Sequence, residues 1–169
     1  MTPTLQTPRL RLVPLAERHI PAYQAFLASP RAAAQGWGML PHEAWRSFAA
    51  MIGHDVLRGF SPFVTEALDD GRAVGLCGPW WPDGQPEREV KWHIWSDADE
   101  GKGYAHEAAQ AVLAHVFGAL GWDTAVSYIL PTNTRSQALA QRLGAQQDDT
   151  WITPHGTKVL VFRHPKVAA

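Results

Sequence analysis

The chain has 169 residues, of which 46% are apolar and 18% are charged, and its formal net charge is −1. A length near the common domain size predicts one globular domain over residues 1–169 with one sizeable core. The near-neutral charge excludes a strong overall field of the kind that attracts nucleic acid or an anionic membrane.

The cysteine content and the hydropathy pattern indicate the cellular compartment of the protein. Cys77 is the only cysteine, which excludes an internal disulfide and favours a reduced compartment. It ends an apolar run at residues 73–77, where a buried small side chain is more common than a catalytic thiol. No segment has the apolar core of a secretory signal or approaches the roughly 20 apolar residues of a membrane span. We therefore expect a soluble, cytoplasmic protein.

The first third of the chain is predicted to form one strand and two helices. Arg9 and Arg11 alternate with the apolar side chains of residues 10–13, which is typical of a half-buried strand. Apolar residues recur at helical spacing over residues 19–27, and a Ser-Pro pair is expected to stop that helix. Residues 31–40, which include Trp37, are expected to form a flexible connector. A second helix is predicted from Pro41 to about residue 59.

Short strands are predicted next. Residues 63–67 and 73–77 flank Asp69-Asp70-Gly71, which is a strong signal for a hairpin turn. Proline and glycine in residues 79–84 predict a loop. Trp80 and Trp81 in this loop either line a pocket or cover the edge of the sheet.

The central unit of the sequence is a strand, a glycine turn and a helix. The strand is predicted at residues 89–95 and the turn at Gly101-Lys102-Gly103, and apolar residues recur at helical spacing from Ala105. Such a unit directs unpaired backbone N–H groups and the positive end of a helix toward one point, which suits a phosphate-bearing ligand. The residues of a P-loop and the third glycine of a dinucleotide fingerprint are both absent.

The last third of the chain completes a mixed α/β pattern. We predict a strand over residues 124–130, a helix over residues 134–143 capped by Asn133 and ended at Gly144, and a final hairpin of residues 150–153 and 158–163. The predicted order is β-α-α-β-β-β-α-β-α-β-β, a mixed α/β layer fold.

Four stretches in the second half of the chain follow one another at spacings that resemble a known family. They are WHIW at residues 92–95, GKGYAHEA at 101–108, PTNTRS at 131–136 and LGA at 143–145. Together they resemble the acetyl-CoA-binding core of the GNAT N-acetyltransferases. The opening TPRLRL at residues 7–12 resembles the branch that acetylates the N-termini of ribosomal proteins.

The resemblance extends from Thr7 to about Phe162 and implies a fold and a co-substrate. The fold would be a single GNAT-like domain with a mixed, mostly antiparallel sheet of about six to seven strands flanked by about four helices. The co-substrate would be acetyl-CoA, with its pyrophosphate on the turn at residues 100–105 and its pantetheine arm along the strand at residues 92–95. The residues implied to bind it are Ile94, Trp95, Ser96, Gly101, Lys102, Gly103, Tyr104, Ala105, Asn133 and Ser136.

One residue departs from the family pattern at the turn. Glu100 stands where the family prefers glutamine or arginine. A carboxylate beside a pyrophosphate is repulsive, so we expect Glu100 to point away and to leave binding to the backbone amides and Lys102.

Candidate catalytic residues follow from the chemistry of amine acetylation. An amine must lose a proton before it attacks a thioester, and the departing thiolate benefits from a proton donor. We expect direct attack without an acyl-enzyme, with Ser136 assisting the thiolate and Glu89 or His93, which share a strand face, acting as base. The alternatives are structural: a serine bonded to its own helix, a solvated strand end and a hydrogen-bonded wall histidine. Glu66 is a weaker candidate for the base.

The function expected from these features is acetylation of a primary amine at a peptide N-terminus or on a small molecule. Trp37, Trp80 and Trp81 are candidates for an aromatic acceptor site. An aminoglycoside or polyamine acceptor, and a CoA-binding sensor without turnover, are the alternatives. His106-Glu107 lacks the second histidine of a zinc helix, so no metal is expected. No nucleic-acid or membrane partner is expected, and a homodimer stays open.

Overall fold

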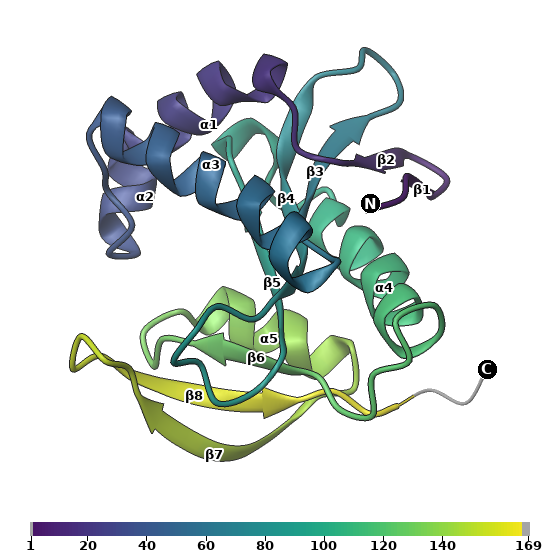
Figure 1. The fold of residues 1–169 in the computed structure, drawn as a ribbon, viewed down its shortest axis with the longest axis vertical. Helices are drawn as coiled ribbons and strands as arrows, with labels where there is room; N and C mark the ends of the chain where they lie inside the picture. Colours follow the sequence, from purple (N-terminus) through teal and green to yellow (C-terminus); the bar gives the residue numbers. More distant parts are fainter. Residues whose placement is uncertain (1, 167–169) are drawn as a thin grey trace.

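The computed structural model describes residues 2–166, which form one eight-stranded sheet with helices on both faces (Figure 1). The strand order is β1-β2-β3-β4-β5-β6-β8-β7, and every neighbouring pair is antiparallel except β5 and β6. The strands are β1 Leu5–Gln6, β2 Leu10–Val13, β3 Phe63–Ala67, β4 Ala73–Trp80, β5 Glu89–Ile94, β6 Val126–Ile129, β7 Gln146–Ile152 and β8 Lys158–Arg163. The helices are α1 Ile20–Leu27, α2 Pro30–Ala34, α3 Pro41–Arg58, α4 Tyr104–Phe117 and α5 Thr134–Arg142.

Two apolar clusters hold the helices on opposite faces of the sheet. On one face, Phe26 of α1 and Phe48 of α3 pack with Leu76 of β4. On the other face, Val112 and other apolar residues of α4 pack against β2, β4 and β5. A smaller cluster seats α5 on β6 and β8. Val90 of β5 belongs to the cluster beneath α4, and the His93 ring stacks on Phe26 of α1, so β5, on which the candidate site is built, lies between the two helical layers.

The sheet is split between β5 and β6. These two parallel strands pair only at Glu89 and Val126 and then separate, so that β6, β8, β7 and α5 form a distinct lower part of the molecule in Figure 1. The N–H of Trp95 donates to the carbonyl of Val74 (3.0 Å). Because antiparallel pairing alternates, the backbone groups of Trp92 and Ile94 point toward the split and away from β4. The split therefore exposes backbone hydrogen-bonding groups of β5.

Local turn and cap signals confirm several predicted boundaries. Asp69, Asp70 and Gly71 form the turn between β3 and β4. The Asn133 side chain accepts a hydrogen bond from the N–H of Ser136 (3.1 Å) and so caps α5. Gly144 follows α5 with a left-handed φ of 83°. The mixed α/β fold and the final hairpin are also confirmed.

The connector predicted at residues 31–40 is wrong in its first part. Residues Pro30–Ala34 form α2, with Ser29 as N-cap accepting a hydrogen bond from the N–H of Ala32 (3.3 Å). A Ser-Pro pair can end one helix, but it is also a preferred N-cap and first helical residue. Here the Ser29-Pro30 pair does both, since α1 ends at Leu27 and α2 begins at Pro30.

The loop predicted at residues 79–84 begins too early, because β4 continues through Pro79 to Trp80. Alternation directs the missing N–H of Pro79 toward β3, and β3 has no residue opposite it beyond Phe63. The proline therefore costs no ladder hydrogen bond.

With β1 and α2 added, the described residues hold eight strands and five helices, more than the six to seven strands and about four helices expected. Within residues 2–166 no helix is long and apolar enough to cross a membrane.

Candidate active site

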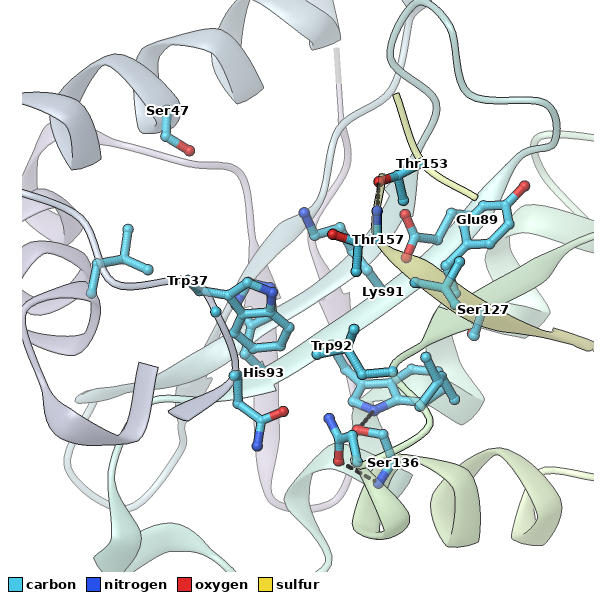
Figure 2. A pocket seen from close by; sticks show the side chains of 18 of the residues that line it. Trp37, Ser47, Glu89, Lys91, Trp92, His93, Ser127, Ser136, Thr153 and Thr157 are labelled. Carbon is cyan, nitrogen blue, oxygen red and sulfur yellow. Dashed lines mark hydrogen bonds between the residues drawn. The ribbon is translucent and has the colours of Figure 1, made fainter. Parts of the chain in front are cut away.

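Two cavities meet at the split in the sheet. The larger, of about 1360 Å³, lies beside the turn at residues 101–103 and is called the glycine-turn cavity. The smaller, of about 440 Å³, lies over β5 and β6 and is called the β5–β6 cavity (Figure 2). Residues that line both are Gln35, Trp37, Trp92, His93, Asn133 and Ser136. A molecule extended along the first cavity can therefore meet a second molecule held in the other.

The glycine turn presents free backbone donors to its cavity. Gly101 and Gly103 have left-handed φ values of 72° and 82°, which glycine adopts without strain. Gly103 is the N-cap of α4 and provides no side chain to cap the helix. Within the part of the chain that the structure describes, the N–H groups of Gly101, Gly103 and Tyr104 have no acceptor. The turn is therefore suited to oxyanions, which unpaired N–H groups and the positive helix end both favour.

Glu100 does not turn away from the cavity as expected. It lines the glycine-turn cavity, and its carboxylate forms ion pairs with Arg31 of α2 and Arg135 of α5. The hydrogen bond from Arg31 is the main reason that the pKa of Glu100 lies below its usual value. Two guanidinium groups thus pair with one carboxylate, so the negative charge of Glu100 is compensated beside the turn.

Lys102 is placed differently from the prediction. Its ammonium pairs with Asp99 (3.0 Å), and its side chain is not among those that line the glycine-turn cavity. Arginine side chains line that cavity instead: Arg9, Arg31, Arg135 and Arg142. These arginines were missed by sequence reasoning, because no local pattern connects α2 and α5 to the turn.

The N-terminal segment holds the glycine turn and the start of α4 in place. The Thr7 hydroxyl donates to a Glu107 carboxylate oxygen (2.6 Å), and Arg9 Nε donates to the other (2.7 Å). Arg9 Nη1 also donates to the carbonyl of Lys102 (2.8 Å). Glu107 lies in the first turn of α4, so these contacts hold that helix end in place. The TPRLRL segment therefore has a structural role at the site.

The free edge of β5 is partly occupied. Arg31 Nε donates to the carbonyl of Ile94 (2.9 Å), which leaves the N–H of Ile94 and both backbone groups of Trp92 facing the split. Of the predicted cofactor residues, Ile94, Gly101, Gly103, Tyr104, Ala105, Asn133 and Ser136 line the glycine-turn cavity. Trp95 is buried beneath α1 and α3, and the Ser96 hydroxyl caps a short turn by accepting from the N–H of Ala98 (3.2 Å).

Ser136 lies where the two cavities meet, and its hydroxyl is oriented by Trp92. The indole Nε1–H of Trp92 donates to Ser136 Oγ (3.3 Å), as the dashed line in Figure 2 shows. Because an indole nitrogen can only donate, the hydroxyl proton of Ser136 stays available for another acceptor. The alternative of a serine bonded to its own helix does not describe this hydroxyl.

Glu89 and His93 share one face of β5 in the β5–β6 cavity, as alternation predicted (Figure 2). Burial raises the pKa of Glu89 above its usual value, which moves it toward that of a base active near neutral pH. Burial, helped by the positive charge of Lys91, holds the pKa of His93 well below its usual value. His93 stays neutral between the rings of Phe26 and Trp37. Its Nδ1 has no hydrogen-bond partner among residues 2–166.

Comparison with known proteins decides the family. A family model described as an acetyltransferase (GNAT) domain matches residues 9–146. The chain belongs to the GNAT acetyltransferases.

Solved structures agree with this family. An acetyltransferase from Agrobacterium tumefaciens is 34% identical, with a TM-score of 0.88 over 98% of this chain and 95% of that chain. RimL, a ribosomal-protein α-N-acetyltransferase solved with coenzyme A, is 14% identical, with a TM-score of 0.78 over 96% and 97%. RimJ of Mycobacterium smegmatis, solved with CoA-disulfide, is 18% identical, with a TM-score of 0.72 over 91% and 80%. At such identities RimL and RimJ are similar in fold alone. A search of curated protein sequences finds no match.

The predicted aromatic wall of this acetyltransferase is only partly present. Trp37 lines both cavities and lies 4.9 Å from the His93 ring, measured between centroids. Trp80 and Trp81 line neither cavity: Trp80 stacks on His54 (4.6 Å), and Trp81 packs against the core cluster that includes Phe60. The cavity wall on the far side comes from the β7–β8 turn, with Thr153, His155 and Thr157, which no sequence signal had marked.

Glu66, the weaker candidate for the base, lies outside both cavities of the acetyltransferase. His19 Nδ1 accepts from the N–H of Ala16 (3.1 Å), so the proton is on Nε2, which donates to Glu66 (3.0 Å). Burial alone would raise the pKa of Glu66, but hydrogen bonds from His19, Arg11 and Arg18 outweigh it and hold the pKa at about 2. Glu66 is therefore an anion at neutral pH in a structural cluster. Cys77 is buried, which raises the pKa of its thiol and makes it unreactive.

Proposed function

We propose that this chain transfers the acetyl group of acetyl-CoA to a primary amine by direct attack. The observation that carries the proposal is the meeting of two cavities at Ser136, one beside a turn with free backbone donors and one holding the half-buried carboxylate of Glu89. The complexes of RimL and RimJ with coenzyme A support the choice of co-substrate.

The residues of the glycine-turn cavity fit a coenzyme A pyrophosphate. Gly101 and Gly103 would offer N–H groups without a Cβ in the way, and an added Cβ at Gly101 would meet no atom within 4 Å. Arg31 and Arg135 would provide positive charge, and the free backbone groups of Trp92 would pair with the pantetheine arm. Acetyl-CoA supplies the thioester that an amine attacks.

The chain's own groups have separate roles in the reaction. Glu89, with its raised pKa, would take the proton that the amine loses, directly or through water. The free hydroxyl proton of Ser136 would stabilise negative charge as the carbon–sulfur bond breaks. His93 is less suited to act as a base, because its lowered pKa makes it a weak proton acceptor. We assign it to the cavity wall together with Trp37.

The acceptor is either a protein N-terminus or a small amine. The fold similarity to RimL and RimJ favours a protein N-terminus, and the limited volume of the β5–β6 cavity, about 440 Å³, fits one residue or a small molecule. The single cysteine, buried as a thiol, is compatible with a cytoplasmic setting.

The test is an acceptor screen that detects the thiol released from acetyl-CoA. The panel contains short peptides with different first residues, amino acids, polyamines and an aminoglycoside. Release of thiol with at least one amine, and a mass gain on that amine that matches one acetyl group, is the expected result. Saturable binding of acetyl-CoA with no amine acetylated would instead favour the CoA-binding sensor.

A further inference from the structure

Lys91 is a half-buried cation without a protein partner in the β5–β6 cavity. It lies on β5 between Glu89 and His93 and on the same strand face (Figure 2). Among residues 2–166 no carboxylate comes within ion-pair distance of its ammonium and no hydrogen bond holds it, although Glu89 is near enough to act on its charge. Its ammonium lies 4.8 Å from the centroid of the Trp80 ring.

An unpaired ammonium in this position is energetically costly. Burial lowers the pKa of Lys91 below its usual value, because removal from water disfavours the charged form. The face of Trp80 compensates in part, since an aromatic ring attracts a cation. An anion entering the cavity would compensate far more, because a buried charge is tolerated when it is paired.

The other side chains that the structure describes in the cavity do not pair with the Lys91 ammonium, so an anionic group of the acceptor can take that place. Within residues 2–166, Glu89 is the only carboxylate side chain that lines it, and His93 and His155 are the other ionisable groups besides Lys91 and two tyrosines. Glu89 and Lys91 are two residues apart on one strand, so their Cβ atoms are separated by about 6.7 Å. The cavity thus presents one group for an ammonium and one for an anion.

We propose that Lys91 binds a carboxylate carried by the amine acceptor, so that the acceptor is an amino acid or a peptide with an acidic residue at its N-terminus. The inference rests on the acetyltransferase function proposed above. Trp80 is then a positioning residue that holds the Lys91 ammonium over the cavity without touching the acceptor. The same ammonium disfavours polyamines and aminoglycosides, which carry like charge.

The test uses matched acceptors that differ only in a carboxylate. One arm compares amino acids with their α-amides, and the other compares peptides with amidated C-termini that begin Asp-Ala and Asn-Ala. Wild type is compared with K91M, which keeps the apolar stem, with K91E, and with K166M as control. Lys166 lines neither cavity and pairs with Asp123 on the surface. The readouts are kcat/KM and, independently of turnover, calorimetric binding of each acceptor in the presence of coenzyme A.

We expect wild type to prefer the carboxylate member of at least one arm by tenfold or more, and that arm identifies the source of the carboxylate. K91M should lose this preference, K91E should reverse it, and K166M should retain it. Equal use of both members by wild type, or an equal loss on both in K91M, would overturn the inference while leaving the acetyltransferase function intact. Selective binding without acetylation of any amine would refute the function and retain the carboxylate site.

Discussion

Removal of the Ser136 hydroxyl should slow acetyl transfer without weakening co-substrate binding. The hydroxyl receives a hydrogen bond from Trp92 Nε1 (3.3 Å) and keeps its own proton free where the two cavities meet. A hydrogen bond to a charged group contributes about 1.5–3 kcal/mol, so the loss of one to a developing thiolate should lower kcat roughly 10- to 150-fold. S136T keeps a hydroxyl on the same helix position and should retain most of the activity.

The assay is thiol release at saturating acetyl-CoA, together with calorimetric titration of the co-substrate for each variant. S136A should show the lower kcat with a Kd for acetyl-CoA within about threefold of wild type. An unchanged kcat would refute the role of the hydroxyl proton. A loss that appears only as weaker acetyl-CoA binding would show that Ser136 holds the co-substrate and does not assist the leaving group.

Three further variants test other parts of the site and the fold. E89Q should abolish the acidic limb of the kcat/KM–pH profile, because that limb reports ionisation of the base. The pKa of Glu89 is raised in the folded state, so its ionisation lowers the stability of the wild type as pH rises through that pKa. E89Q should therefore have a higher Tm than wild type at pH 8 and a similar Tm near pH 4. G101A and G59A both place a Cβ at left-handed φ in open space, so each should lower the free energy of unfolding by about 1–2 kcal/mol. Only G101A should weaken acetyl-CoA binding, and equal affinities of the two variants would contradict the anion-binding turn. E66Q should lose up to about 3 kcal/mol of unfolding free energy at pH 7, because the pKa of Glu66 is lowered from 4.5 to about 2, and urea titrations should show this difference shrinking as pH falls from 4.5 toward 2.

The parts of the fold that sequence reasoning predicted well depend on local chemistry. The turn at Gly71, the Asn133 cap and the glycine turn each require a residue type at one position, whatever packs around it. Ser29-Pro30 was misread because the same two residues can end one helix and begin the next. Pro79 was misread because its effect depends on whether a neighbouring strand stands opposite its nitrogen, which only the sheet order decides.

The parts of the site that could not be predicted depend on contacts between distant segments. Glu100 is paired with Arg31 and Arg135, and residues from α2, the turn and α5 come together only in the folded chain. Lys102 was predicted to bind phosphate because it lies between two glycines, but its ammonium forms an ion pair with the nearby Asp99. Lys91 gave no signal at all, because an alternating lysine on a strand usually faces solvent, whereas here it lines a cavity together with residues of the β7–β8 turn.

Calorimetric titration with acetyl-CoA tests the central claim most directly. The free donors of the glycine turn and the open edge of β5 predict saturable binding of one co-substrate per chain, with a Kd below about 1 mM, the upper end of the usual KM range. G101A should bind more weakly than wild type under the same conditions, and G59A should not. The absence of binding heat, with no thermal shift at millimolar acetyl-CoA, would contradict the account.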